Sequence, residues 1–117
     1  MTSSKQGKIF SLEPGDSHFS VQLSQNGPKK TVDLCTDVVN HSPTGVALGY
    51  LGSGPAQAAL SILCELYGKD LKKHPIHYKD FKFDVIACQN PKMPFQITQR
   101  DIETYIETTL RQDVDLN

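Results

Sequence analysis

The 117-residue sequence has no tryptophan, only three cysteines and no excess of charge of one sign. The 12 basic residues are balanced by 13 acidic ones, so the chain lacks the net positive charge that binding to duplex DNA usually requires, and nucleic acid is disfavoured as a partner. No run of about 18 apolar residues occurs, and residues 1–8 are polar, so we expect neither a membrane span nor a secretory signal. These absences predict a cytoplasmic protein.

The cysteines and histidines offer little chemistry. Cys35, Cys64 and Cys88 are an odd number set far apart, which fits neither a disulfide framework nor a zinc knuckle, so we expect reduced cysteines packed in the core. His74 and His77 could each offer a metal ligand, but the proline between them makes the pair awkward on a helix. We expect no metal and no cofactor.

The N-terminal third has the pattern of strands. Apolar and polar residues alternate over 19–23 and again over 31–34, which is the period of a half-buried strand. The sequence Asn-Gly-Pro at 26–28 favours a turn, so the two runs predict an antiparallel hairpin. Residues 9–10 are expected to add an edge strand, and residues 46–50 one more short strand.

The centre of the chain predicts a buried helix over residues 55–67. Its first residue is a proline, which suits the first turn of a helix, and Gly68 suits its end. Apolar residues surround nearly the whole circumference, and only Gln57, Ser61 and Glu65 form a narrow polar stripe. Such a helix is typical of a protein interior.

The C-terminal third predicts two further helices. The spacing of Tyr78, Phe81, Val85 and Cys88 favours a helix, although alternation over 81–85 would also suit a strand. A short strand is expected at Phe95 and Ile97, before the last helix. Thr98 and Asp101 have the spacing of a capping box, and the apolar residues that follow recur every three or four positions.

Together these elements predict an α+β fold, a single domain spanning residues 1–117. An N-terminal antiparallel hairpin or small sheet packs against about three helices, of which the central one is buried. Residues 1–8 and 113–117 are expected to fray. Because an apolar helix needs cover on every side, a homodimer is one arrangement that would supply it.

The most unusual local feature is the glycine-rich turn from Gly49 to Pro55, which leads into the buried helix. Glycines allow close approach of the backbone, and the start of a helix presents free N–H groups to an anion. The candidate ligand-binding residues are Tyr50, Gly52, Ser53, Gly54 and Gln57. The alternative interpretation is a tight structural corner with no ligand.

Known phosphate loops and catalytic turns do not match this segment. The Walker pattern requires Gly-Lys-Ser/Thr, but Gly54 is followed by Pro55 and Ala56. The dinucleotide fingerprint would need a third glycine at the position of Gln57, and a nucleophile elbow would need glycines two residues either side of Ser53. With no paired carboxylates or activated nucleophile in evidence, we assign no catalytic residue and favour a non-enzymatic protein.

The turn resembles that of a small uncharacterised family found in bacteria, archaea, phages and plasmids, in which Gly-Tyr-Gly-Gly-Ser-Gly-Pro leads into an Ala/Leu-rich helix. The residues that carry the resemblance are the run from Gly49 to Leu60, followed by Tyr78, Phe81-Lys82 and Val85-Ile86-Ala87. This chain departs from the family pattern at Leu51, Leu48 and Phe95, where the family has a glycine, an aromatic residue and a tryptophan. The resemblance implies an accessory protein of a phage or other mobile element, located in the host cytoplasm.

Two functions follow as hypotheses. In the first, the turn binds a small anionic or nucleotide-type ligand. In the second, the protein inhibits a host protein, such as a defence nuclease, through charged surfaces. Charge is indeed uneven, because residues 69–92 carry six lysines against three aspartates, while residues 98–117 carry five acidic residues against two arginines.

Overall fold

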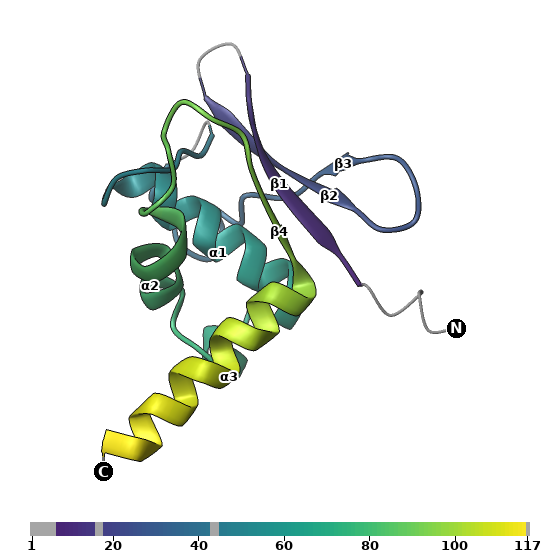
Figure 1. Cartoon of the computed structure of the whole chain (residues 1–117). Helices are drawn as coiled ribbons and strands as arrows, with labels where there is room; N and C mark the ends of the chain where they lie inside the picture. The colour runs from purple at the N-terminus through teal and green to yellow at the C-terminus, as the bar shows by residue number, and fades with distance from the viewer. Residues whose placement is uncertain (1–6, 16–17, 43–44, 117) are drawn as a thin grey trace.

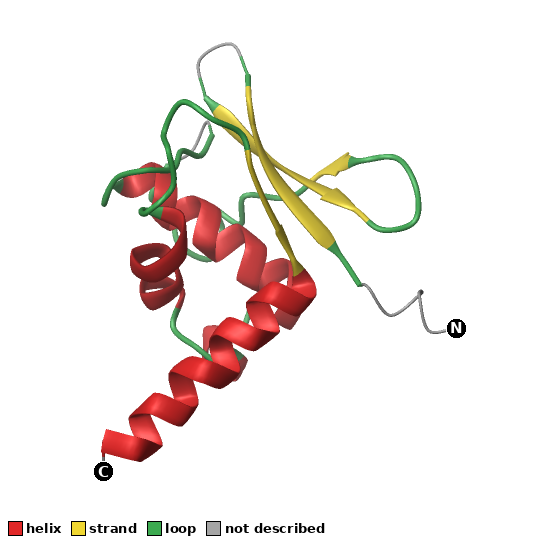
Figure 2. Ribbon diagram, viewed as in Figure 1, coloured by secondary structure: helices red, strands yellow, loops and turns green. Residues whose placement is uncertain are grey.

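An antiparallel sheet forms one side of the molecule, and the helices gather on the other (Figure 2). The computed structural model describes residues 7–15, 18–42 and 45–116. The sheet has the order β3-β2-β1-β4, with bounds Ile9–Pro14 for β1, Phe19–Ser24 for β2, Lys30–Thr31 for β3 and Phe95–Thr98 for β4. The predicted α+β fold, a small sheet packed against three helices, is confirmed.

β1 lies at the centre of this sheet. Phe10 faces Leu23 of β2 on one side and Ile97 of β4 on the other. The strand predicted at residues 9–10 is present but runs over Ile9–Pro14, and the predicted position at an edge of the sheet was wrong. Phe10 and Leu12 point to the core and are fully buried, and Ser11 on the opposite face is also nearly covered, as expected for a strand with neighbours on both sides.

The predicted hairpin forms between β2 and β3, with Asn26 in the left-handed conformation at φ 62°. Its second strand is short, because β3 ends at Thr31 and Val32 adds a single further bond, from its N–H to the Val21 carbonyl. The strand expected over residues 46–50 is absent. Only Val46 forms a bridge, with Phe19.

Three helical regions complete the fold (Figure 1). The long helices are α1 (Ser53–Tyr67) and α3 (Gln99–Leu116), and between them α2 (Tyr78–Phe81) continues into the π-helical turn η3 (Lys82–Ile86) after a 3₁₀ turn, η2 (Leu71–Lys73). The choice of helix over strand is thus confirmed for residues 78–86, whereas Ala87 and Cys88 lie in a turn. Of the ends expected to fray, residues 1–6 and 117 lie outside the described ranges, and α3 is helical through Leu116.

The ends of α1 and α3 follow the local sequence. Gly68 ends α1 at φ 92°, and its N–H donates to the Cys64 carbonyl over 2.8 Å. Thr98 and Asp101 form the predicted capping box, because each backbone N–H donates to the other residue's side chain, over 3.2 and 3.0 Å. α3 therefore starts directly at the end of β4.

The core lies between the sheet and α1, with α2 and α3 packed on the helix side. Every residue of α1 from Gly54 to Cys64 is buried, as predicted for an all-round apolar helix. Among the described residues, no helix combines the length and the hydropathy that a membrane crossing requires.

Candidate functional site

The glycine-rich turn is anchored at its first residue. Gly49 has a φ of 84°, and its N–H donates to the Ile86 carbonyl over 3.1 Å. A Cβ atom at Gly49 would lie 2.6 Å from the Gln89 carbonyl oxygen and 2.7 Å from Pro91 Cδ. Both the conformation and the close contact require glycine, so the turn is held against the segment that follows η3.

The later glycines make room for a tyrosine. A Cβ atom at Gly52 would overlap the Tyr50 ring, and one at Gly54 would lie 3.2 Å from the Tyr50 hydroxyl and 2.7 Å from Ala47 Cβ. Tyr50 therefore lies against the backbone of the turn, with its hydroxyl directed to the start of α1. Because the residue is still 51% exposed, one side of it is presented to solvent in a defined position.

The structure brings together four of the five predicted ligand-binding residues and separates the fifth. Tyr50, Gly52, Ser53 and Gly54 adjoin one another in the turn. Gln57 is fully buried, and its amide is engaged elsewhere. The side-chain oxygen accepts from the N–H groups of the two loop residues His41 (2.6 Å) and Ser42 (2.9 Å), and the side-chain nitrogen donates to the carbonyls of Leu34 and Val39.

The start of α1 offers few donors to a ligand. Gly52 is the N-cap and has no side-chain capping bond, Pro55 has no N–H, and the Ala56 N–H already donates to the Gly52 carbonyl. The remaining first-turn amides are those of Ser53 and Gly54. Ser53 is exposed, whereas Gly54 is buried beneath the Tyr50 hydroxyl, so an anion would meet Ser53 first.

A second feature of the turn is its exposed apolar surface. Gly49, which precedes Tyr50 and Leu51, packs against Pro91 of the following loop. Leu51 is 60% exposed, and Met93, two residues after Pro91, is 56% exposed. We call Tyr50, Leu51, Pro91 and Met93 the turn surface. The sequence did not predict that Pro91 and Met93, the loop residues of this surface, would be part of it. The usable signal was an apolar residue, Met93, between two prolines in a segment too short to bury it.

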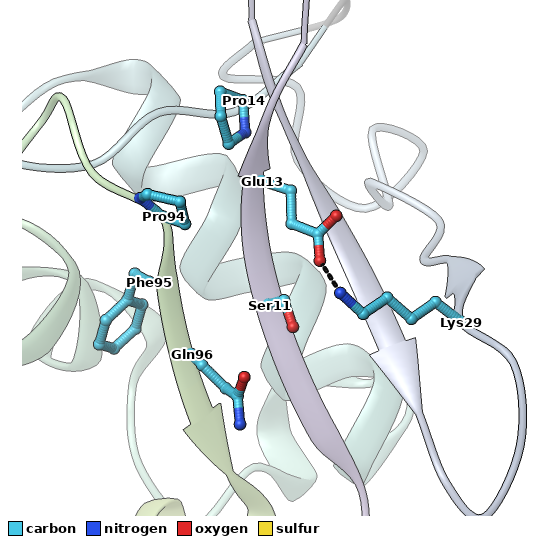
Figure 3. Close-up of a pocket in the computed structure, with 7 residues that line it drawn as sticks. All are labelled: Ser11, Glu13, Pro14, Lys29, Pro94, Phe95 and Gln96. Carbon is cyan, nitrogen blue, oxygen red and sulfur yellow. Dashed lines mark hydrogen bonds and ion pairs between the residues drawn. The ribbon is translucent and has the colours of Figure 1, made fainter.

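A polar groove lies elsewhere, on the outer face of the sheet (Figure 3). Its volume is about 470 Å³, and it is lined by Ser11, Glu13, Pro14, Lys29, Pro94, Phe95 and Gln96. Lys29 and Glu13 form an ion pair at its margin. None of the predicted ligand-binding residues lines this groove.

The cysteines divide into a buried pair and an exposed residue. Cys35 and Cys64 are buried and free as predicted, and burial raises the pKa of Cys35 to about 12, so its thiol is protonated at neutral pH. The prediction that Cys88 packs in the core was wrong. It is exposed, because η3 turns it outwards, where its thiol contacts the Phe83 carbonyl.

Metal-ligating side chains do not converge in the described residues. No three histidine, cysteine, aspartate or glutamate side chains within the described ranges lie close enough to hold an ion. The ring of His74 instead bonds through Nε2 to the Gly68 carbonyl, and that of His77 accepts at Nδ1 from the Lys79 N–H. Each imidazole thus has a local partner.

The fold and turn define a small α+β domain in which a four-stranded antiparallel sheet packs on a buried helix entered through a glycine-rich corner. The chain belongs to a family of unknown function, DUF6166, whose match covers residues 15–108 and so includes the turn, α1, α2, the first part of α3 and the strands β2, β3 and β4. Comparison with curated proteins and with solved structures gave no match.

Proposed function

We propose that this protein is a non-enzymatic binding protein that docks onto a partner protein through the turn surface. The observation that carries the proposal is the half-exposed Tyr50, held against the turn backbone, with Leu51 exposed next to it in the chain and Met93 exposed on the loop whose Pro91 packs against Gly49. Exposed apolar side chains that gather on one surface are typical of protein interaction sites. The resemblance to a family found in phages and plasmids favours a host protein, such as a defence nuclease, as the partner blocked.

The geometry of Tyr50 favours a role at the centre of an interface. Tyrosine and methionine are enriched at interfaces, and tyrosine offers a large contact area with few rotatable bonds. Tyr50 is already held in place in the unbound protein, because its ring rests on Gly52, so binding would cost little further side-chain entropy. Binding would therefore require little rearrangement of the turn.

The charge near the turn surface favours an acidic partner. Lys92 is exposed in the loop between Pro91 and Met93, and within the described part of the chain it forms no ion pair. A carboxylate at the rim of the partner's apolar contact would complement it.

The test compares protein capture by the wild-type chain and by Leu51→Ser/Met93→Ser. Both side chains are exposed, so the double substitution should leave folding unchanged. Losing a central contact costs about 2 kcal/mol, so we expect the affinity for a captured bacterial partner to fall about thirtyfold. Capture from lysate at low and high salt, followed by a titration of the purified partner, measures the change.

Leu110→Ser provides the matched control. Leu110 is also an exposed apolar residue, but it lies on α3 rather than in the turn or the adjoining loop. The proposal requires Leu110→Ser to bind like the wild type. Equal loss in both variants, or no specific partner at either salt concentration, would contradict it.

A second candidate function is recognition of a small anionic ligand, such as a nucleotide, at the start of α1. It is favoured by the exposed Ser53, whose hydroxyl and amide have no hydrogen-bond partner among the described residues, and by the adjacent Gly54 amide. Tyr50 would stack on the ligand or move aside.

Amide NMR with labelled protein tests this candidate directly. Titration with nucleotides and cyclic nucleotides should shift the Ser53 and Gly54 amide resonances first, because these groups would donate to the anion. Unchanged resonances at saturating ligand would exclude the start of α1 as the binding site.

A further inference from the structure

Two imidazoles flank one buried tyrosine on the side of the molecule where α2 meets the loop over residues 35–42. Tyr78, the first residue of α2, is only 4% exposed. The His41 Nε2 atom lies 2.7 Å from its hydroxyl oxygen, and the His77 ring stacks on the Tyr78 ring at 4.9 Å with an interplanar angle of 21°. Residues 37 positions apart in the sequence thus form one cluster.

The charged side chains of α2 and η3 are segregated around this cluster. The Tyr105 hydroxyl donates to Asp84 over 2.6 Å, which places this carboxylate against α3, and Asp80 lies one helical turn earlier in the same segment. Lys79 directly follows Tyr78, and Lys82 lies one helical turn after Tyr78. Burial, together with the charges of these two lysines, lowers the pKa of the His41 imidazole. Asp84 is therefore engaged by α3, whereas both lysines adjoin, in the helical segment, the tyrosine that bonds to His41.

The lysines of the cluster are not neutralised. Across the described ranges, neither Lys79 nor Lys82 forms an ion pair. The exposed His77 accepts the Lys79 backbone N–H at Nδ1, so in its neutral form the ring carries its proton on Nε2, as a free donor. Two ammonium groups and an imidazole N–H are thus available, and the cluster includes no carboxylate.

The supporting loop holds His41 in place before any ligand arrives. The His41 N–H donates to the buried Gln57 side-chain oxygen over 2.6 Å, which ties the loop to α1, while the ring bonds to Tyr78 of α2. A site whose donors come from elements joined in this way needs little reorganisation to bind.

We propose that His41, His77, Lys79 and Lys82 form a binding site for a dianionic phosphate group. Lysines bind phosphate as point charges, imidazoles add directed donors, and the absence of carboxylates from the cluster rules against a cation. Tyr78 bonds to His41 and the charges of the two lysines act on it, so an anion that offsets the lysine charges would favour protonation of His41. This site is separate from the turn surface and does not depend on the proposed protein partner.

Imidazole NMR of the full chain tests the proposal, with inorganic phosphate and adenosine monophosphate as probes. We expect both histidine ring signals to shift on titration, with a rise in the pKa of His41 at saturation. Lys79→Gln/Lys82→Gln should weaken phosphate binding about tenfold or more, equivalent to about 1.4 kcal/mol. Tighter binding of the nucleotide than of inorganic phosphate would identify a nucleotide as the ligand class, and equal binding a simple phosphate group.

Lys72→Gln/Lys73→Gln is the matched control, because it removes the same charge from exposed lysines on η2. The proposal requires this variant to bind phosphate like the wild type. If both double variants weakened phosphate binding equally, the loss of affinity would reflect overall charge, and the proposed site would be wrong. The proposal would also be wrong if the histidine ring signals did not shift on titration, or if only the Ser53 and Gly54 amide signals shifted.

Discussion

Gln57 shows how one buried polar side chain can organise a loop. Its amide has bonds to four backbone groups between Leu34 and Ser42, a segment without regular secondary structure. One turn later on α1, Ser61 donates to the Asp33 carbonyl over 2.7 Å. The polar stripe of α1 therefore faces a loop that covers it, and it satisfies groups that would otherwise be buried without partners.

This arrangement predicts a large loss of stability in Gln57→Leu. The substitution introduces an apolar side chain of similar size but leaves several sheltered backbone groups unpaired, at about 1–3 kcal/mol for each such group. We expect a loss on the order of 4 kcal/mol in the free energy of unfolding, measured by urea denaturation. Ser61→Ala, which removes a single bond, should cost about 1 kcal/mol. Similar losses in the two variants would contradict this interpretation of Gln57.

At the scale of elements, the glycine-rich turn combines two different uses of glycine. Gly49 is required by its positive φ and by its contact with the loop at Gln89 and Pro91. Gly52 has an extended φ of −129°, which any residue can adopt, so its small size is what matters, since it leaves space for the Tyr50 ring. The turn is therefore a structural corner that also displays an aromatic side chain.

The short helical segment formed by α2 and η3 contributes buried residues to the core and charged residues to the surface. Phe81 and Ile86 are buried, while Asp84 bonds to Tyr105 of α3 and Lys82 lies one helical turn after Tyr78. The widened π-helical turn places its residues differently from an α-helix, which explains why Cys88 misses the buried face predicted from α-helical spacing.

At the scale of the whole molecule, the His41 interactions link three parts of the fold, namely the loop over residues 35–42, α1 through Gln57 and α2 through Tyr78. Burial, with a further effect of Lys79 and Lys82, lowers the pKa of His41 below its usual value of 6.5. The unfolded chain therefore binds a proton more readily than the folded protein, and stability present above pH 6.5 is lost as the pH falls through the folded-state pKa.

We accordingly predict that the melting temperature falls between pH 7.5 and pH 5, and that His41→Gln reduces the slope. Thermal unfolding followed by circular dichroism in phosphate-free buffers measures both curves. The other histidines remain in the variant, so the difference between the two slopes isolates His41. Parallel curves would show that His41 does not carry the pH dependence.

The local sequence alone determined those elements that depend only on residues close together in the chain. The buried helix and its end at Gly68, the capping box at Thr98 and the hairpin turn at Asn26 each depend on residues a few positions apart, and each prediction was correct. The amphipathic pattern of α3 is of the same kind, since its buried face repeats along one helix.

Tertiary structure decided which of these residues meet. The central position of β1 depends on pairing with β4, more than 80 residues later, and strand order leaves little trace in a local pattern. The burial of Gln57, the packing of Tyr50 on Gly52 and the meeting of His41 with Tyr78 likewise depend on the path of a loop. The use of the glycine-rich turn in this chain, as a corner that supports an exposed tyrosine, thus becomes visible only when the loops are in place.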